Sequence, residues 1–214
     1  MERELQLKPY ITVSTPARSE ITVQKSRFIA DCLPVHSEQE VGEKLAEIRS
    51  AFWDASHHCY AYSIGPGGEF SRFSDDGEPS STAGMPMMEA IRYAGVTDVL
   101  CVVTRYFGGI LLGTGGLVKA YSQACRSALE AAAKIRMAPA AVYAYSVPYP
   151  LYGTFSRISE QYAETDETSF GENVFCRIHI STEKEQRFLN ELRERTNGKL
   201  TGKREKECFF PFSV

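Results

Sequence analysis

The 214-residue sequence has no apolar run long enough to cross a membrane. Its longest uninterrupted hydrophobic run, residues 140–145, is far shorter than the roughly 20 residues of a spanning helix. The first residues are charged and polar, so we expect no secretory signal. These absences predict a cytoplasmic protein that makes no membrane contact.

The chain also lacks the cysteine pattern of common metal and redox motifs. None of its six cysteines forms a C-x-x-C pair, which argues against a zinc ribbon or a thioredoxin motif. A strong overall charge is missing too, because 24 basic and 27 acidic residues leave a net charge of −3. Any nucleic-acid binding must therefore use a local basic patch. Hydrophobic residues make up 43% of the chain, as expected of a globular protein.

The second part of the chain has a readable order of elements. A strand over residues 141–149 precedes a helix whose apolar residues recur at positions 151, 155, 158 and 162. Two strands follow, over 164–170 and 174–180, and then a helix capped near Ser181 or Thr182. After the Asn197-Gly198 turn comes a last strand. The order β-α-β-β-α-β is that of the ferredoxin-like arrangement.

The first part mixes strands and helices in a different order. Strands are expected over residues 10–13 and 21–35, with an irregularity near Lys25, and again over 57–64 and 99–107. Ser37 and Glu40 predict a capping box at the start of one helix. A short helix around Met87 and a long one over about 116–134 follow, and residues 65–82 read as a loop. The fold class is therefore α+β.

A glycine-rich segment, residues 105–119, joins a strand to a helix and is the most unusual part of the sequence. Glycines allow close backbone approach, and a helix N-terminus offers unpaired N–H groups and a partial positive charge. These are the needs of an anion site, although a tight structural turn explains the glycines equally well. The candidate anion- or RNA-binding residues are Arg105, Gly108, Gly109, Gly113, Thr114, Gly115, Gly116, Lys119 and Arg126.

An acidic segment offers a second, weaker candidate. Asp75, Asp76 and Glu78 place three carboxylates within four residues, enough to suggest a hard cation such as magnesium. The same residues also suit a structural turn, and Ser81 or Thr82 could cap the following helix. We treat the three carboxylates and His58 as weak catalytic candidates, and the carboxylates as weak metal candidates. The sequence calls for no cofactor.

Two further segments carry chemistry-bearing side chains. On a strand, His57 and Cys59 share one face and His58 lies on the other, so a Cys–His nucleophile pair is conceivable. Residues 193–206 hold six basic and two acidic residues. Such a run is either a solvated face or the footprint of a contact with RNA or the ribosome.

Five motifs together resemble the IMPACT family in its bacterial YigZ branch. They occupy residues 25–30, 58–62, 74–79, 82–84 and 103–117. Two positions depart from the family pattern: Ser81 stands where a glycine is expected, and Met85 where a basic residue is common. Both departures lie beside the acidic segment.

The resemblance implies two domains, an IMPACT-type domain over residues 1–138 and a ferredoxin-like domain over residues 139–214. It implies that the first resembles the second domain of a small-subunit ribosomal protein, and that the pair is similar to consecutive domains of elongation factor G. Eukaryotic relatives are regulators of translation that compete for the activator of a starvation-sensing kinase.

The sequence leaves more than one function open. We favour a non-catalytic translation regulator that binds the ribosome, RNA or a translation-related protein partner through the glycine-rich segment and its basic face. The alternative is a metal-dependent enzyme acting on a phosphate-containing substrate, which requires the acidic and glycine-rich loops to converge. A protein-binding adaptor using the same surface is a third reading.

Overall fold

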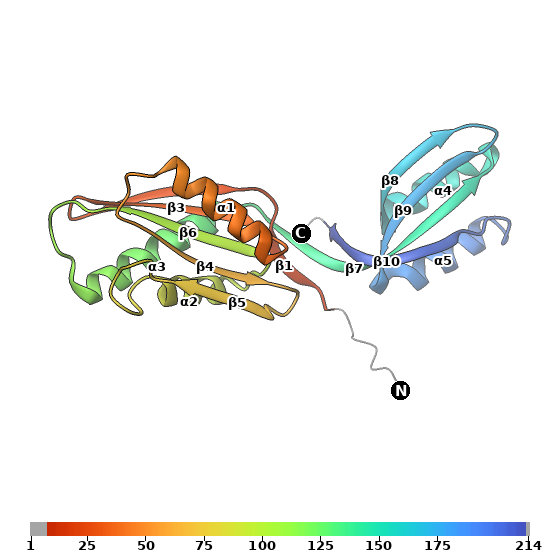
Figure 1. Cartoon of the computed structure of the whole chain (residues 1–214). Helices are drawn as coiled ribbons and strands as arrows, with labels where there is room; N and C mark the ends of the chain where they lie inside the picture. Colours follow the sequence, from red (N-terminus) through yellow and green to blue (C-terminus); the bar gives the residue numbers. More distant parts are fainter. Residues whose placement is uncertain (1–7, 213–214) are drawn as a thin grey trace. The chain divides into compact units, whose positions relative to one another are not determined.

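The chain forms two compact units, each with its own sheet and core. The structure, a computed structural model, describes residues 8–212 (Figure 1). One unit comprises Tyr10–Arg136 and the other is mainly residues 137–212. In the described part of the chain, no helix combines the length and the apolar composition of a membrane span.

The N-terminal unit is an antiparallel sheet with helices on both faces. Its strands lie in the order β2-β3-β6-β4-β5. Helix α1 covers one face, and α2 and α3 cover the other (Figure 1). The bounds are β1 Tyr10–Val13, β2 Ala17–Val23, β3 Ser26–Pro34, α1 Glu38–Ala51, β4 His57–Ile64, β5 Phe70–Ser74, α2 Gly84–Ala94, β6 Val99–Tyr106 and α3 Gly113–Ala131.

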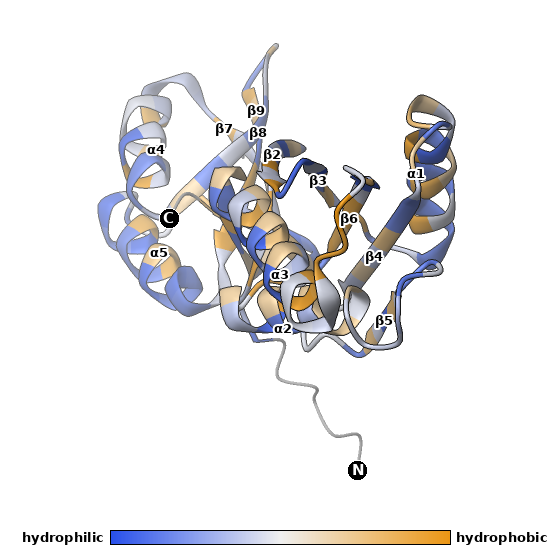
Figure 2. Cartoon of the chain, turned by 90° about the vertical axis from the view of Figure 1, so that its left-hand side faces the viewer, coloured by the Kyte–Doolittle hydropathy of each residue, from blue (hydrophilic) through white to orange (hydrophobic). Residues whose placement is uncertain are grey.

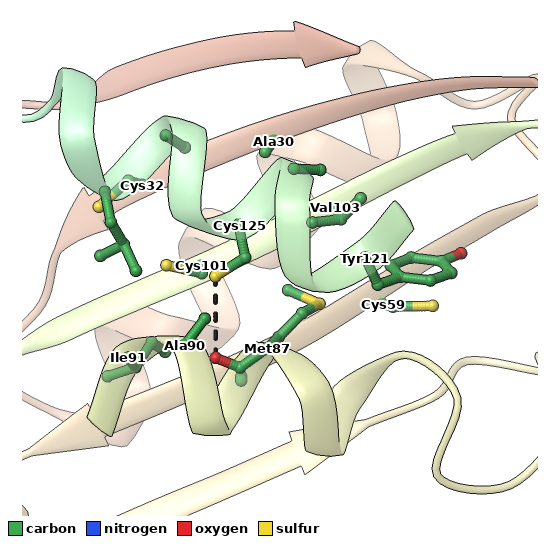
Figure 3. Close-up of a cluster of buried hydrophobic side chains, with 14 of the residues drawn as sticks. Ala30, Cys32, Cys59, Met87, Ala90, Ile91, Cys101, Val103, Tyr121 and Cys125 are labelled. Carbon is green, nitrogen blue, oxygen red and sulfur yellow. Dashed lines mark hydrogen bonds between the residues drawn. The ribbon is translucent and has the colours of Figure 1, made fainter. Parts of the chain in front are cut away.

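Strand β6, in the middle of the sheet, is buried on both of its faces. Its residues alternate between the two layers, so that Leu100 and Val102 join the core under α1. Cys101 and Val103 join the core under α2 and α3, which Figure 3 shows in close-up. A strand buried on both faces has a nearly continuous apolar sequence, as residues 99–103 do. Figure 2 shows the matching apolar residues on the helices that cover the sheet.

Three local predictions in this unit need correction. The strand expected over 21–35 is a hairpin, because Gln24 and Lys25 both have positive φ (44° and 68°) and form a two-residue turn between β2 and β3. Part of the predicted loop is strand β5, an edge strand of exposed residues that pairs with β4. The capping box is incomplete: Ser37 accepts from the Glu40 N–H, but the Glu40 carboxylate accepts from His36 N–H instead.

The C-terminal unit has the element order that the sequence predicts. Its bounds are β7 Lys134–Val147, α4 Tyr149–Tyr162, β8 Ala163–Phe170, β9 Val174–Ser181, α5 Thr182–Arg195 and β10 Lys203–Phe212. The strands lie in the order β10-β7-β9-β8. Its core contains Phe155 and Ile158 from α4, Phe188 and Leu192 from α5, and the inward residues of the sheet.

All six cysteines are free thiols, and five of them are buried. Only Cys208, on β10, is partly exposed. Because buried thiols react slowly, we expect Ellman's reagent to modify one thiol per folded chain rapidly at pH 8 and six after denaturation. The Cys208→Ser variant should lose the rapid phase while Cys176→Ser keeps it. A rapid phase that survives in Cys208→Ser would contradict the packing described here.

Candidate functional site

The acidic loop and the glycine-rich loop converge on one cavity of about 490 Å³ in the N-terminal unit. The sequence left this convergence open. The acidic loop contributes residues between β5 and α2, and the glycine-rich loop contributes the connection from β6 to α3. The lining residues are Ser56, His57, Glu78, Pro79, Arg105, Phe107, Leu111, Leu112, Gly113, Thr114 and Leu117.

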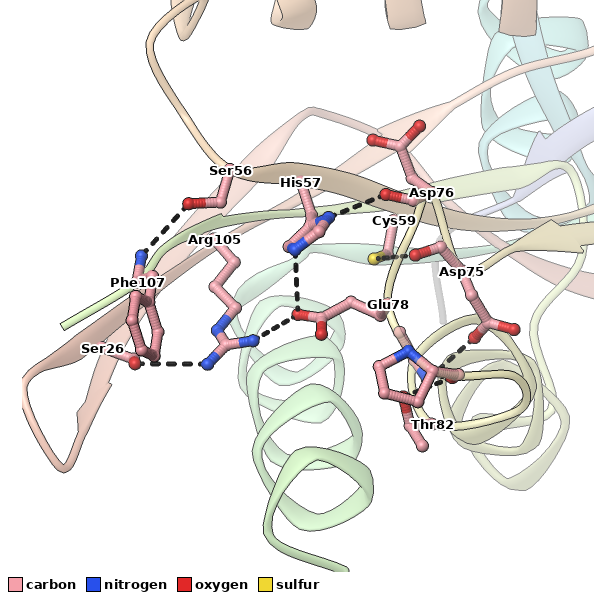
Figure 4. Close-up of polar contacts among 12 residues, drawn as sticks. Ser26, Ser56, His57, Cys59, Asp75, Asp76, Glu78, Thr82, Arg105 and Phe107 are labelled. Atoms are coloured by element: carbon pink, nitrogen blue, oxygen red, sulfur yellow. Dashed lines mark hydrogen bonds and ion pairs between the residues drawn. The ribbon is translucent and has the colours of Figure 1, made fainter. Parts of the chain in front are cut away.

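A buried ion pair lies in the wall of this cavity (Figure 4). The Glu78 Oε1 accepts hydrogen bonds from Arg105 Nη1 at 2.6 Å and from the Tyr121 hydroxyl at 2.7 Å. The Glu78 and Arg105 side chains are only 3% and 6% exposed. The guanidinium also lies 5.4 Å from the ring centroid of Phe28 and 5.5 Å from that of Phe107.

This arrangement changes the role that the sequence suggested for Arg105. The sequence predicts a cation beside the glycine-rich loop that binds an anion. Its charge is instead compensated by Glu78, and its side chain is buried on the α2–α3 side of the sheet. Burial also raises the pKa of Tyr121, so its hydroxyl remains a hydrogen-bond donor to Glu78.

The Asp75 carboxylate caps helix α2. Its Oδ1 accepts from the backbone N–H groups of Ala83 and Gly84 at 2.9 and 2.8 Å, and its Oδ2 accepts from that of Ser81 at 2.8 Å. The helix has no side-chain cap from its own N-cap residue, Ala83. Asp75 therefore takes the capping role that the sequence suggested for Ser81 or Thr82, and its charge meets the positive end of the helix.

Asp76 is held by other groups. Its Oδ2 accepts from the His58 N–H at 2.6 Å, and its Oδ1 accepts from Arg49 Nη2 at 3.1 Å. Asp75, Asp76 and Glu78 thus face three different sets of partners. Within residues 8–212, no three His, Cys, Asp or Glu side chains are grouped so that they could hold a metal ion.

The backbone conformation at Ser81 explains why a glycine is expected at this position. It adopts a positive φ of 62°, a conformation that costs a non-glycine residue about 1–2 kcal/mol. We expect Ser81→Gly to raise the free energy of unfolding by up to about 1 kcal/mol, since the side chain makes no hydrogen bond in the described structure. Denaturant titration of this variant measures the change, with Ser80→Gly as the control because Ser80 has an ordinary φ. A lower free energy of unfolding in Ser81→Gly would show that the backbone at Ser81 is not strained.

The histidine that faces the cavity is His57 and not His58, the weak catalytic candidate of the sequence. The His57 Nδ1 lies 2.8 Å from the carbonyl oxygen of Asp76, which only accepts, so Nδ1 carries the proton. Its Nε2 points toward Glu78, 3.9 Å from Oε1 (Figure 4). The His58 ring is buried, with Nε2 at 3.1 Å from the Phe52 carbonyl. The alternation of side chains along the strand puts His57 on the same face as Cys59. This was the feature of the sequence from which the direction of His57 could have been predicted.

Cys59 is not positioned as a nucleophile. Its side chain is fully buried and its Sγ donates to the Asp75 carbonyl at 3.0 Å. Burial raises the pKa of the Cys59 thiol to about 12. The thiol is therefore protonated at neutral pH, and the Cys–His nucleophile pair considered from the sequence is wrong.

The glycines of the loop have distinct roles. A Cβ on Gly108 would lie 2.1 Å from the backbone carbonyl carbon of Lys25, so Gly108 permits two backbone segments to touch. Gly109 and Gly113 have positive φ of 81° and 69°. Gly115 and Gly116 lie in the first turn of α3, together with Thr114.

The first turn of α3 leaves backbone donors available. The N-cap residue, Leu112, provides no side-chain cap, and the first turn contains no acidic residue. The first four N–H groups of a helix have no intrahelical partner, so this end can bind an anion. Lys119 and Arg126 are exposed on the same helix. Lys25, which is not among the candidates predicted from the sequence, is exposed beside Gly108 and adds a third cation.

Comparison with known proteins places this chain in a two-domain class. A family model described as the Impact N-terminal domain matches residues 24–129, and a domain of unknown function, DUF1949, matches residues 146–199. A solved crystal structure of a hypothetical protein is 30% identical with a TM-score of 0.62, covering 93% of this chain and 98% of that one.

Whole-length relatives identify the family. The IMPACT family member YvyE of Bacillus subtilis is 36% identical over 90% of this chain and 89% of its own length. YigZ of Escherichia coli is 31% identical over 91% of this chain and 97% of its own length. The chain belongs to the IMPACT family, as its motifs predicted. Protein IMPACT of Bos taurus matches a shorter stretch, 34% identical over 44% of this chain and 30% of its own length.

Proposed function

We propose that this chain is a non-catalytic, translation-associated regulator that binds RNA phosphates of the ribosome through the glycine-loop face. We define this face as Lys25, the N-terminus of α3, Lys119 and Arg126. The observation that carries the proposal is that the uncapped amides of α3 and three exposed cations come from adjoining segments. Backbone amides and lysines are groups that bind the phosphates of nucleic acids.

The architecture of each unit supports this proposal by analogy. The βαββαβ order and the β10-β7-β9-β8 sheet are compatible with the elongation factor G domain that the family resemblance implies. We also propose the ribosomal-protein type for the N-terminal unit. Since fold alone does not determine function, the binding residues must carry the test.

The metal-dependent alternative is disfavoured by the use of its carboxylates. Asp75 caps α2 and Asp76 accepts from His58 N–H and Arg49, while Glu78 balances Arg105. A metal would have to displace these hydrogen bonds. By taking Glu78 as a ligand, it would also leave the buried guanidinium of Arg105 without its counter-ion.

Salt dependence of RNA binding tests the proposed face. A labelled single-stranded fragment of ribosomal RNA should bind with a log–log salt slope of about −0.7 per phosphate neutralised. The double variant Lys119→Glu/Arg126→Glu should bind more weakly. Its salt slope should be shallower by the contribution of about one to two phosphate contacts, at about 0.7 for each contact. The control Arg92→Glu reverses an exposed charge on α2. Equal affinities and slopes for the wild type and the double variant would refute RNA binding at this face.

A further inference from the structure

The cavity between the acidic and glycine-rich loops has apolar walls and few polar groups. Phe107, Leu111, Leu112 and Leu117 line it from the glycine-rich loop and α3, and Pro79 lines it from the acidic loop. Its volume of about 490 Å³ lies in the range of about 300–1,000 Å³ typical of small-molecule sites. RNA phosphates have no use for such walls, so the cavity points to a different ligand.

Two apolar side chains of the cavity lining are exposed to solvent. Leu111 is 86% exposed and Phe107 is 48% exposed, although both line the cavity. Ile110, immediately before Leu111, is 42% exposed but does not line it. An apolar body seated in the cavity would cover Leu111 and Phe107 and gain about 25 cal/mol per Å² of apolar area removed from water.

The charges around the cavity favour an anionic group on that body. Arg105 and Glu78 balance each other, which leaves the positive N-terminus of α3 as the uncompensated charge in the lining. Gly113 and Thr114, which line the cavity, supply amides of the first helical turn. An anionic oxygen at this end would accept hydrogen bonds from these amides, for which the N-cap side chain supplies no acceptor.

The His57 Nε2 has a free hydrogen-bonding position on the cavity side. It makes no hydrogen bond within residues 8–212, because Glu78 Oε1, at 3.9 Å, is too distant. A polar ligand atom on this side of the cavity would give Nε2 a partner.

We propose that this cavity binds a small amphiphilic anion, an aromatic or branched apolar body carrying one carboxylate, sulfonate or phosphate group. The apolar body packs against Leu112, Leu117 and Phe107. The anionic group lies at the N-terminus of α3, and His57 Nε2 meets a polar atom of the body. This site shares the amides at the N-terminus of α3 with the proposed RNA contact and goes beyond that contact, since it uses the cavity rather than Lys25, Lys119 and Arg126.

A matched pair of dyes tests whether both the body and the anion matter. 8-Anilinonaphthalene-1-sulfonate carries the sulfonate, and N-phenyl-1-naphthylamine has the same rings without it. We expect the sulfonate dye to bind the full chain more tightly, with enhanced fluorescence, and to shift the His57 ring signals in the NMR spectrum. Equal binding of the two dyes, or unmoved His57 signals, would overturn the proposal.

Two neighbouring substitutions locate the site. Leu111→Asp removes an apolar contact and puts a negative charge at the mouth, so the sulfonate dye should bind about tenfold more weakly. Ile110→Asp adds the same charge one residue away, outside the lining, and should change affinity by no more than about twofold. Both residues are exposed, and unfolding curves check that both variants remain folded. Equal losses in the two variants would refute binding in this cavity.

Discussion

Replacing Glu78 with alanine is expected to lower the free energy of unfolding by about 3–5 kcal/mol. The substitution leaves the buried guanidinium of Arg105 without its counter-ion and removes the acceptor of the Tyr121 hydroxyl. Chemical denaturation followed by circular dichroism measures the loss. Glu89→Ala, at an exposed position on α2, should change stability by less than about 0.5 kcal/mol.

A double variant separates the buried charge from the packing. Glu78→Leu/Arg105→Met removes both charges together, and apolar replacements of buried ion pairs are often neutral or stabilising. It should therefore be clearly more stable than Glu78→Ala. If Glu78→Ala cost less than about 1 kcal/mol, the Arg105 side chain would have to reach solvent, and the cavity described here would be wrong.

Alanine at Gly108 and alanine at Gly115 are expected to have opposite effects. At Gly108 the new Cβ would overlap backbone atoms of Lys25 at 2.1–2.2 Å, so the hairpin and the loop must separate, at a cost of at least about 1–3 kcal/mol. At Gly115 nothing lies within 4 Å of the new Cβ, and alanine should stabilise the helix by about 0.5–1 kcal/mol.

The same denaturation experiment measures both glycine variants. Comparing the stabilities of the two variants distinguishes Gly108, where two backbone segments touch, from Gly115, where a helix can accept a side chain. If Gly108→Ala were as stable as the wild type, the contact between the β2–β3 turn and the glycine-rich loop would not exist. Lys25 would then lose its place on the glycine-loop face.

Periodicity predicted the elements that bury a regular face and failed where burial is irregular. Helix α1 and the βαββαβ order of the C-terminal unit follow from apolar spacing. Strand β5 was missed because most of its residues are exposed, so no alternation marks it. The Gln24-Lys25 turn was predicted only as an irregularity within one strand, because neither residue is the glycine or asparagine that usually signals positive φ.

The site was only partly readable for a similar reason. Arg105 lies on the face of β6 that carries Cys101 and Val103, so alternation predicts its inward direction. Its partner, Glu78, is 27 residues away in a loop, and no local pattern links the two. The capping role of Asp75 likewise depends on a chain reversal of eight or nine residues that spacing rules do not describe.

Co-sedimentation with ribosomes tests the central claim most directly. The full chain should pellet with ribosomes at low salt and be released as salt increases, since few phosphates are contacted. Charge reversal at Lys25, Lys119 and Arg126 should abolish pelleting. The matched triple reversal at Lys44, Arg92 and Arg157, which lie on three other helices, should retain it. Equal pelleting of the two triple variants, or none by the wild type at low salt, would contradict the account.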